Sequence, residues 1–374
     1  MRVAMIGWEF PPNITGGLGT HLRELTATLG KRCELHVFIP GVEDFIERHE
    51  RFTAHLIKTP RIKNIYENMD IVKNYNKEVV KRVIKLDVEK PIDVIHAHDW
   101  LTAAAGIELK TFLKKPLVFS VHSLEKQRTL RDLDNYPSQM EKLGVEKSDA
   151  VITVSKMMKK ILVSDFGVNE KKIKVIYNAY EERAFEYVDI IKKYILRKPL
   201  IVFLGRLTEQ KGPENLIYAA KKVLDRKKAN FVFIGAGHLM EPLKRFARTL
   251  GIENQVMFTG FVSEDEKKSF LQEADIIVLP SKHEPFGIVA LEALSFRKPT
   301  ILSKNFGALE LVRDAVVVSD TKSDALASAI LDLLGSDEKR KQLSKKAEEV
   351  VKSLPTWEDV ANMTIEVYDG VVYS

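Results

Sequence analysis

The segment from Ala274 to Leu294, ADIIVLPSKHEPFGIVALEAL, constrains the fold more than any other part of the sequence. It opens with a short apolar run, Ile276–Leu279, which predicts a buried strand. A polar loop follows, and because Pro285 disfavours helix at the residue before it, Glu284 is expected in that loop where the strand ends. An apolar helix is then expected to begin near Gly287. The segment therefore predicts a strand, a polar loop and a helix in direct succession.

Glu292 lies inside this expected helix, with apolar residues on every helical face. An unpaired carboxylate there would cost about 3 to 5 kcal/mol unless another group bonds it. A buried ion pair or a helix cap would meet that need, and so would a bound ligand. We favour a ligand, because the loop glutamate, Pro-Phe-Gly and the helical glutamate arrive together after a strand.

This stretch resembles the Glu-x7-Glu signature of retaining glycosyltransferases with the GT-B fold, and Glu284 and Glu292 match its two glutamates. The resemblance implies that Glu292 holds the ribose of a nucleotide-sugar donor and that Glu284 holds the transferred sugar. It also places the backbone amides of Phe286, Gly287 and Ile288 near the sugar and phosphates. The chemistry fits, since carboxylates accept from hydroxyls and free N–H groups at a helix start suit anionic phosphate.

Length and composition indicate two domains in this chain of 374 residues, of which 45% are apolar. No apolar run approaches the roughly 18 residues of a membrane span, and the N-terminus is too short for a signal peptide, so we expect a cytoplasmic protein without an integral membrane segment. One cysteine, Cys33, excludes an internal disulfide and a cysteine metal cluster. The net charge of +6 is spread along the chain without a nucleic-acid-binding module, so no nucleic-acid partner is expected.

The N-terminal part of the chain predicts a βαβ unit with a strand at Arg2–Gly7, a helix at Leu18–Gly30 and a strand at Leu35–Ile39. Between the first strand and the helix lies WEFPPNITGGLGTH, whose glycines let the backbone approach an anionic ligand at the helix start. It is not the dinucleotide fingerprint, because the third glycine is missing and the second strand ends without an acidic residue. The family has this loop in the same place, with Gly17 near the diphosphate and transferred sugar. The combination of EFPP with GGLG most resembles the glycogen synthase branch.

A charged region at about Glu43–Asn76 is expected to be irregular, and the strand Asp93–His96 follows it. Asp99 precedes a helix and is expected to be its N-cap. His96 and His98 lie at the carboxyl end of the strand, the ligand side of an open α/β sheet. Two histidines with this spacing could bind a metal, but the sequence reveals no third ligand, so no metal site is expected.

The strand Leu117–Val121 ends at His122. The family places a histidine here that contacts and orients the donor sugar, so the resemblance gives His122 that role; the alternative is a histidine bonded only to backbone. Further along, Asp132–Asp134 matches the Asp-x-Asp metal motif of the other major glycosyltransferase fold, but it lacks the strand context and is expected to be loop. The strand Ala150–Val154 leads to Ser155, the expected N-cap of the next helix.

A domain boundary is expected after the strand Ile173–Tyr177. The sequence IYNAYEERAF resembles the family linker, usually Pro-Asn-Gly, with Tyr177 and Ala179 in place of the proline and glycine. The expected organisation is an acceptor-side domain at 1–185, a linker at 186–198, a nucleotide-sugar-binding domain at 199–355, and a last helix at 356–374 that crosses back onto the first domain.

The second domain opens with the strand Leu200–Leu204, and GRLTEQKG follows it directly. Arg206 and Lys211 therefore lie on a loop at the carboxyl end of a strand, where cations can hold a diphosphate without a metal. The family has Gly-Arg and Lys-Gly pairs at this point, and the sequence matches both. The resemblance thus implies that these two side chains stabilise the departing diphosphate.

Three further strand ends complete the expected site. The strand Phe231–Ile234 ends in Gly235-Ala236-Gly237, a turn that lets backbone approach the nucleotide. The strand Val256–Thr259 leads to Phe261, in a stretch where the family binds the base, partly through backbone. After the strand Thr300–Ser303 the family usually has two glycines before a glutamate, and Ala308 departs from this pattern.

These features together predict an α/β chain of the GT-B fold, with two Rossmann-like domains and an interdomain cleft. The resemblance makes His122, Glu284, Arg206 and Lys211 the catalytic residues. It implies front-face attack with retention of configuration, in which the acceptor passes its proton to the departing phosphate and no dedicated carboxylate base is needed. No cofactor is expected beyond the nucleotide-sugar, which is a co-substrate.

The favoured function is transfer of glucose from ADP- or UDP-glucose to an α-glucan or to a small acceptor such as a sugar phosphate. Two other classes stay open: a transferase with a lipid-linked acceptor at the membrane surface, and a GT-B-fold sugar-nucleotide isomerase or non-catalytic glucan-binding protein. The base, the sugar, the acceptor and the oligomeric state are not determined by the sequence.

Overall fold

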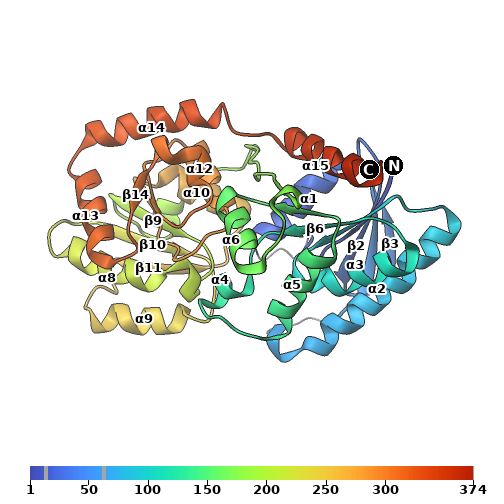
Figure 1. Ribbon diagram of the computed structural model, residues 1–374. Coiled ribbons are helices and arrows are strands. Elements are labelled where there is room, and N and C mark those ends of the chain that lie inside the picture. The colour runs from blue at the N-terminus through green and yellow to red at the C-terminus, as the bar shows by residue number, and fades with distance from the viewer. Residues whose placement is uncertain (12–15, 61–64, 374) are drawn as a thin grey trace. The chain divides into compact units, whose positions relative to one another are not determined.

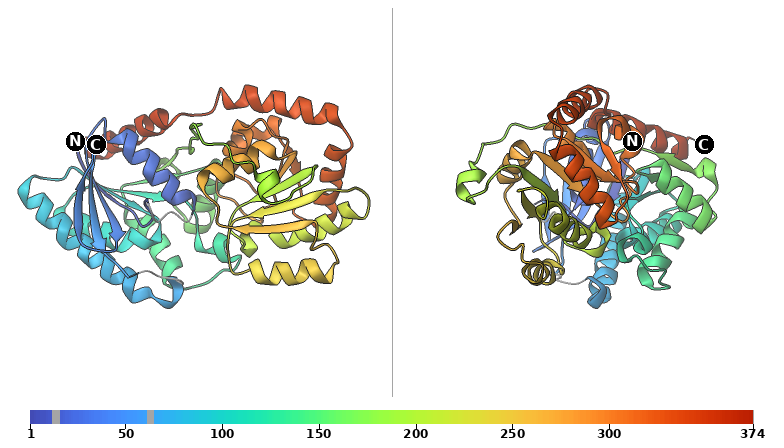
Figure 2. Two further views of the ribbon diagram at one scale, coloured as in Figure 1. Left: turned by 180° about the vertical axis from the view of Figure 1, so that it is seen from behind. Right: turned by 90° about the vertical axis from the view of Figure 1, so that its left-hand side faces the viewer.

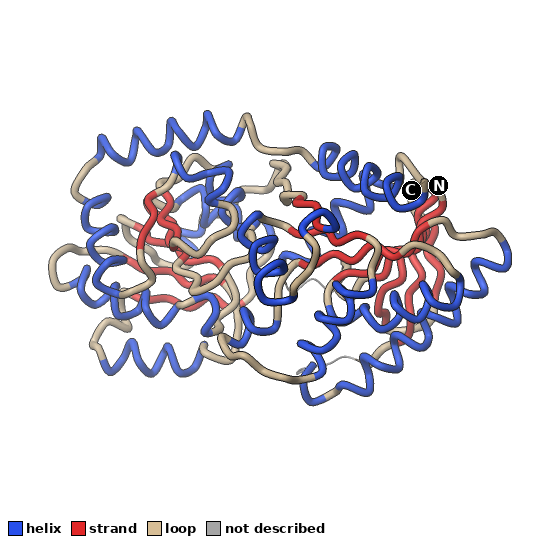
Figure 3. Tube along the Cα trace, viewed as in Figure 1, coloured by secondary structure: helices blue, strands red, loops and turns tan. Residues whose placement is uncertain are grey.

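The computed structural model describes residues 1–11, 16–60 and 65–373, which form two compact units. Each unit contains one sheet of mainly parallel strands with helices packed around it, as the strands and helices of Figure 3 show. The predicted α/β class with two Rossmann-like domains is therefore confirmed. Unit 1 consists of Met1–Lys126, Arg131–Asn178 and Pro355–Ser374, and unit 2 consists of Gln127–Leu130 and Ala179–Leu354.

The described residues of unit 1 form an eight-stranded sheet in the order β3-β4-β2-β1-β5-β6-β7-β8. Neighbouring strands are parallel, except that β3 runs antiparallel to β4. The central strands are continuous apolar runs because helices bury both of their faces. The strands are β1 (Arg2–Ile6), β2 (Glu34–Gly41), β3 (Phe45–Arg48), β4 (Thr53–Lys58), β5 (Val94–His98), β6 (Leu117–Val121), β7 (Ala150–Thr153) and β8 (Ile173–Val175).

Helices cover both faces of the unit 1 sheet. In Figures 1 and 2, α1 and α15 lie together on one face, while α2, α3 and α5 lie on the other. The helices and 3₁₀ turns are α1 (Gly17–Leu29), η1 (Ile65–Glu67), α2 (Met69–Glu89), α3 (Trp100–Leu113), α5 (Tyr136–Lys147), α6 (Lys156–Phe166), η2 (Glu170–Lys172) and α15 (Trp357–Val372). The short helix α4 (Glu125–Thr129) begins in unit 1 and ends in unit 2.

The described residues of unit 2 form a six-stranded sheet in the order β11-β10-β9-β12-β13-β14, with all neighbours parallel. Its core includes the fully buried rings of Phe203, Phe231 and Phe233. The strands are β9 (Leu200–Leu204), β10 (Asn230–Ile234), β11 (Val256–Gly260), β12 (Ile276–Leu279), β13 (Thr300–Ser303) and β14 (Val317–Ser319).

The helices of unit 2 connect these parallel strands. Helix α14 buries Ala347 but is otherwise largely solvated, as its charged sequence predicts. The helices and 3₁₀ turns are α7 (Ile190–Lys193), η3 (Glu209–Lys211), α8 (Pro213–Leu224), α9 (Met240–Thr249), α10 (Glu264–Glu273), α11 (Ile288–Ser295), α12 (Leu309–Val312), η4 (Arg313–Ala315), α13 (Ser323–Leu334) and α14 (Asp337–Val351).

Each sheet contains one point at which the strand order reverses. In unit 1 this point lies between β1 and β5, and in unit 2 it lies between β9 and β12. Ligands of open α/β sheets bind outside the carboxyl ends of the strands at such points, because the neighbouring loops diverge there. The topology therefore predicts ligand sites at the loops that follow β1, β5, β9 and β12.

The expectation that about Glu43–Asn76 is irregular is wrong. This region contains β3, β4, η1 and the start of α2. The sequence signal is weak because all four residues of β3 are exposed, so this edge strand has no apolar run. Residues 61–64 of the region, and residues 12–15 of the WEFPPNITGGLGTH loop, lie outside the described residues. The expectation that Asp132–Asp134 is loop is confirmed, since these residues lie between the short helix α4 and α5.

The last helix, α15, is an integral part of unit 1. Its capping box at Thr356 and Asp359 starts the helix, and its Tyr368 is fully buried. The Tyr368 hydroxyl lies 2.6 Å from Nδ1 of the buried His96, whose Nε2 lies 2.7 Å from the Ser120 hydroxyl. No helix of the described chain combines the length and the apolar character needed to cross a membrane.

Replacing Tyr368 by phenylalanine should lower the free energy of unfolding of unit 1 by about 1 to 3 kcal/mol, because buried His96 loses a hydrogen-bond partner. Urea denaturation measures the change. Tyr373→Phe is the matched control on the same helix end, since that side chain is 79% exposed; its effect should stay within about 0.5 kcal/mol. Equal effects of the two substitutions would contradict the structural role of the buried hydroxyl.

Candidate functional site

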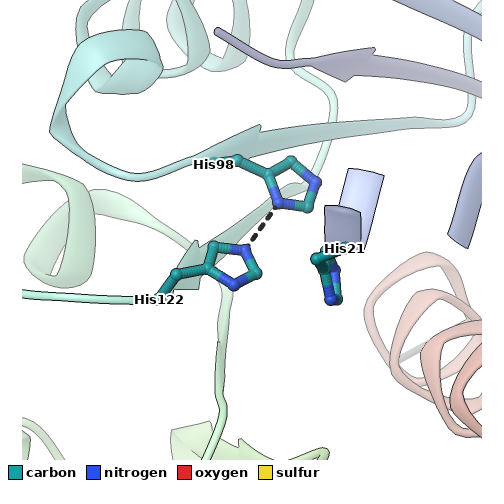
Figure 4. Close-up of side chains that lie close together, drawn as sticks. All are labelled: His21, His98 and His122. Atoms are coloured by element: carbon teal, nitrogen blue, oxygen red, sulfur yellow. Dashed lines mark hydrogen bonds between the residues drawn. The ribbon is translucent and has the colours of Figure 1, made fainter. Parts of the chain in front are cut away.

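Three histidine rings come together at the carboxyl edge of the unit 1 sheet. His98 is the last residue of β5, His122 follows β6 directly, and His21 lies on α1. His98 Nδ1 lies 3.0 Å from His122 Nε2, and the ring centroid of His21 lies 4.4 Å from that of His122 (Figure 4). The sequence analysis placed His98 and His122 at strand ends, and the structure adds His21 from a helix far away in the sequence.

Two side chains fix this histidine cluster, which is defined by His21, His98 and His122. The Asn178 amide oxygen lies 2.7 Å from His21 Nδ1, so that nitrogen carries the proton. Asp99 was expected to be the N-cap of α3, but its carboxylate makes no cap hydrogen bond and instead accepts from the backbone N–H of His122 at 2.8 Å. Asp99 therefore occupies the expected N-cap position of α3, with a φ of 56°, but its side chain does not cap the helix and instead positions His122.

The cluster is uncharged at neutral pH. Burial lowers the pKa of His21 and His98 well below the ordinary value, and neighbouring histidines lower it further. Burial lowers the pKa of His122 to about 4. Each ring therefore keeps one nitrogen lone pair that can accept a hydrogen bond or bind another group.

Gly17 is the first residue of α1, the helix that follows β1 in the sequence. The first turn of this helix carries no acidic side chain. Its backbone N–H groups and the positive end of the helix dipole are suited to an anionic group.

In unit 2, Lys211 and Glu284 form a partly buried ion pair at the point where the strand order reverses. Glu284 follows β12, as the sequence predicts, and is 7% exposed. Its carboxylate also accepts from the Ser281 hydroxyl at 3.2 Å. Lys211 ends the 3₁₀ turn η3 after β9, so two loops that were recognised separately in the sequence meet at one charged pair.

Arg206 belongs to the loop that also carries Lys211, but its side chain is exposed to solvent, whereas those of Lys211 and Glu284 are largely covered. It follows β9 and Gly205, and a Cβ built on Gly205 would come within 3.9 Å of the Lys211 side chain. Arg206 is exposed, and it forms no ion pair within the described part of the chain. Its guanidinium is therefore available to an anion, whereas the Lys211 charge is already shared with Glu284.

Gly287 is required by the geometry of the loop before α11. It has a φ of 92°, and a Cβ there would lie 2.4 Å from the Phe306 ring and 2.8 Å from the Glu284 side chain. Phe286 is buried, and Ile288 begins α11. The backbone N–H of Ala308 donates to the Phe286 carbonyl at 2.9 Å. The backbone of Ala308 adopts the right-handed helical conformation, so an alanine in place of the family's glycine causes no backbone strain.

Glu292 has the bonded partner that its apolar surroundings predict. It is 7% exposed, and its Oε1 lies 2.7 Å from Nζ of Lys267 on α10. Burial raises the pKa of Glu292, and the Lys267 charge opposes that rise. Burial by itself would lower the pKa of Lys267, but Glu292 and Glu264 raise it overall. The partner seen in the structure is an ion pair, one of the alternatives left open by the sequence.

Gly235 and Phe261 lie at the carboxyl ends of the next two strands of the unit 2 sheet. Gly235 has a φ of 125°, and a Cβ there would meet the Gly205 carbonyl at 2.2 Å, so the turn accepts no side chain. The backbone N–H of Gly235 donates to the Gly260 carbonyl at 3.0 Å. Phe261 is 77% exposed beside it. An exposed aromatic ring next to a bare backbone turn suits a flat ligand surface.

Sequence reasoning missed three of the residues that shape these sites: His21, Lys267 and Asn178. A signal existed for His21, because it lies three residues after Leu18 and four before Leu25, on the apolar side of its helix. Polar residues on such a side are buried and need partners. Lys267 lies on a strongly charged helix, and nothing local distinguishes it from its neighbours.

Both halves of the chain match glycosyltransferase families. Residues 189–350 match the family model described as "Glycosyl transferases group 1", and residues 15–183 match the one described as "Glycosyltransferase Family 4". An uncharacterized glycosyltransferase of Methanocaldococcus jannaschii is 33% identical, with 98% of each chain covered. A glycogen synthase of Mycobacterium tuberculosis is 28% identical over 98% of this chain and 94% of its own length.

Solved structures share the fold at low sequence identity. Sucrose-phosphate synthase from Thermosynechococcus elongatus superposes with a TM-score of 0.84 at 20% identity, covering 100% of this chain and 99% of that one. The catalytic domain of starch synthase IV from Arabidopsis thaliana, bound to ADP and acarbose, has a TM-score of 0.80 at 18% identity, with 100% and 99% covered. HepE from Anabaena in complex with UDP-glucose has a TM-score of 0.76 at 17% identity, with 100% of both chains covered.

Replacing Lys267 by methionine should lower the free energy of unfolding of unit 2 by about 3 to 5 kcal/mol near neutral pH, because Glu292 stays buried without its counter-charge. The substitution raises the pKa of Glu292 in the folded state further. Between the pKa of Glu292 in the unfolded state and its higher pKa in the folded state, the folded protein therefore holds a proton that the unfolded chain lacks. The loss of stability should therefore grow as pH rises through that window. Urea denaturation at several pH values measures it.

Two further variants separate this ion pair from general effects of the substitution. Lys267 also pairs with Glu264, whose side chain is 69% exposed. Glu264→Gln should lower the free energy of unfolding by less than about 1 kcal/mol. The double variant Lys267→Met with Glu292→Gln should recover part of the lost stability. A loss that is independent of pH and unchanged in the double variant would argue against the buried pair.

Proposed function

The chain belongs to the group 1 glycosyltransferases of the glycogen synthase-like branch, and from that premise we propose that it transfers glucose from ADP- or UDP-glucose to an α-glucan or to a small sugar acceptor. The nucleotide-sugar donor is supported by similar structures that hold ADP with acarbose or UDP-glucose. The glucan acceptor is supported by the glycogen synthase relative, and the small acceptor by the sucrose-phosphate synthase neighbour.

One observation carries the proposal: the ion pair of Lys211 and Glu284 lies where the unit 2 sheet reverses its strand order, and Arg206 follows Gly205, which lies beside Lys211. Two cations beside a carboxylate suit a donor that presents a diphosphate next to sugar hydroxyls. The exposed Arg206 guanidinium binds phosphate oxygens in a fork geometry, and Lys211 adds a second charge. Glu284 accepts from the hydroxyls of the transferred sugar.

The remaining donor contacts follow the same chemistry. Glu292 accepts from the ribose hydroxyls, and the backbone N–H groups at the start of α11, beginning with those of Gly287 and Ile288, are directed at the phosphates. The bare turn at Gly235 and the exposed ring of Phe261 receive the base. From the family resemblance we also propose a sugar-binding role for His122 and a phosphate-binding role for Gly17.

We propose a reaction with retention of configuration by front-face attack. The acceptor hydroxyl approaches the side that the diphosphate leaves and gives its proton to a departing phosphate oxygen. The transition state then concentrates negative charge on the diphosphate, and Arg206 and Lys211 stabilise that charge. This route is consistent with the neutral state of His122, which donates or accepts a hydrogen bond without having to act as a charged acid.

A sugar acceptor is favoured over a lipid-linked one by the packing of α6, the helix that carries MMKKILV. Its apolar residues Met158 and Leu162 are buried within unit 1. Lys159 on the same helix forms an ion pair with Glu170 at 3.2 Å. Of the apolar side chains on this helix only Val163 is exposed, so the helix lacks the wide apolar face that binds a membrane surface.

Arg206→Ala should reduce turnover at least about 100-fold, the scale of removing one transition-state charge stabiliser. The substitution leaves stability unchanged, since the exposed guanidinium pairs with no described carboxylate. Initial rates of nucleoside diphosphate release measure the effect. Lys221→Ala on α8 is the control, because that exposed lysine pairs with Asp225 one turn away, and it should keep the wild-type rate. A wild-type rate in Arg206→Ala would refute the assignment.

The proposed function is tested by nucleoside diphosphate release from ADP-, UDP- and GDP-sugars, each with and without glycogen. We expect release from a glucose donor that glycogen stimulates, or that a sugar phosphate stimulates in its place. Stimulation only by lipid-linked acceptors in vesicles would overturn the acceptor class. Failure of every donor to bind, measured by calorimetry, would overturn the assignment as a transferase.

A further inference from the structure

The histidine cluster in unit 1 has the composition and spacing of a metal site. His21, His98 and His122 each offer one nitrogen, and the three nitrogens lie within 4.8 Å of one another. Figure 4 shows that the rings come from separate elements and gather around one point. We propose that this cluster binds a divalent transition-metal ion, with Zn²⁺ as the preferred ion.

The separation of the ligand atoms is close to that of a zinc site. Zn²⁺ binds imidazole nitrogen at about 2.0 to 2.1 Å in tetrahedral geometry, so two ligand nitrogens lie about 3.3 Å apart. His98 Nδ1 and His122 Nε2 are 3.0 Å apart without an ion. When the ion binds, the proton between them moves to the far nitrogen of its ring. Small rotations of the side chains then bring His21 to the same ion.

Hydrogen bonds already orient the cluster for ligation. The Asn178 amide oxygen holds the His21 proton on Nδ1 at 2.7 Å, which leaves the lone pair of His21 on Nε2. The Asp99 carboxylate holds the backbone of His122 at 2.8 Å. The Thr102 hydroxyl lies 2.7 Å from the backbone nitrogen of His98. The bond to Asn178 fixes the ring and the tautomer of His21, as metal-binding histidines require, while the other two bonds hold the backbone of His122 and His98.

A second observation points to a missing partner. His98 is fully buried, and its Nε2 has no hydrogen-bond partner among the described residues. Buried polar atoms in native proteins are nearly always bonded, and an exception calls for a functional group, a water or an ion. His98 Nε2 therefore lacks a partner on the side of the ring away from His122, and it can hold the ring proton when Nδ1 binds the ion.

The ligand set also selects the ion. Three neutral imidazoles with no carboxylate suit Zn²⁺, Co²⁺, Ni²⁺ or Cu²⁺, whereas Mg²⁺ and Ca²⁺ prefer oxygen ligands. His122 is only partly buried, so a fourth position is open for water. The ion is thus distinct in kind from a Mg²⁺ that accompanies a diphosphate.

Metal binding has one consequence that rests on the proposed function. An ion bound to His122 occupies the ring that is assigned to the donor sugar. Zn²⁺ and the nucleotide-sugar then exclude each other, and Zn²⁺ inhibits the transferase without being a cofactor of the reaction. The binding itself does not depend on this consequence.

The test uses the full chain without a polyhistidine tag, stripped of metal with a chelator. Titration with Co²⁺ should give the visible absorption bands of a tetrahedral site and saturate at one equivalent, and calorimetry should give a Zn²⁺ dissociation constant of about 1 µM or tighter. His98→Ala, His21→Ala and the partly exposed His122→Ala should each weaken Zn²⁺ binding at least about 100-fold. Asn178→Ala should weaken it about 10-fold, as removal of an outer hydrogen bond does. Mg²⁺ should not displace Co²⁺.

The matched control is the other histidine pair of unit 1, in which His36 Nδ1 lies 3.0 Å from His55 Nε2. His55→Gln should leave the Co²⁺ spectrum and the Zn²⁺ affinity unchanged, because among the described residues no third ligand groups with this pair. The site is overturned if Zn²⁺ binds more weakly than about 100 µM, if binding survives the loss of His122 and His21, or if His55→Gln weakens binding equally. Zn²⁺ binding that leaves donor affinity unchanged overturns the exclusion of the donor and points to a failure of the proposed role of His122.

Discussion

Parallel pairing of the strands is the constraint on which both candidate sites depend. His98 pairs with Ser120 across β5 and β6, so the chain that leaves β6 carries His122 past the same edge two residues later. In unit 2, the parallel pairing of β9 with β12 brings the loops of Lys211 and Glu284 to one point. The strands satisfy their backbone groups within the sheet, so the loops beyond their ends can present polar side chains.

The two motif glutamates, Glu284 and Glu292, each form an ion pair with a lysine. Lys211 pairs with Glu284 in a loop that Gly287 and Phe306 hold in place. Lys267 pairs with Glu292 on α11. A ligand that bonds these carboxylates meets acceptors whose positions are set before it arrives, so less side-chain entropy is lost on binding.

Much of the fold could be predicted because its central strands are apolar on both faces. Ile276–Leu279, Leu117–Val121 and Leu200–Leu204 match the predicted strands residue for residue, since continuous apolar runs give a clear signal when helices cover both sides of a sheet. The edge strand β3 could not be found this way because all of its residues are exposed. Local rules gave the N-cap position of Asp99 but not its partner, because its carboxylate accepts from the backbone N–H of His122, just beyond β6.

The residues of the candidate sites could be predicted where they lie in local motifs, but not where their contacts are distant in the sequence. Glu284, Lys211 and Gly287 were identified because each lies in a short motif directly after a strand. His21 and Lys267 were not, because their contacts join segments far apart in the sequence: His21 meets His122 about a hundred positions later, and Lys267 reaches across from α10 to α11. Sequence patterns report local periodicity, whereas such contacts exist only after the sheets have formed.

The division of the chain into units also bears on how it folds during synthesis. Unit 1 takes its last helix from beyond unit 2, and the buried Tyr368 hydroxyl bonds His96 across 272 positions of sequence. Unit 2 is nearly continuous and leaves the ribosome before α15 does. Domains fold as units, and the N-terminal one usually comes first; in this chain, unit 1 can bury Tyr368 only after the C-terminal helix has been synthesised, when the whole of unit 2 has already been made.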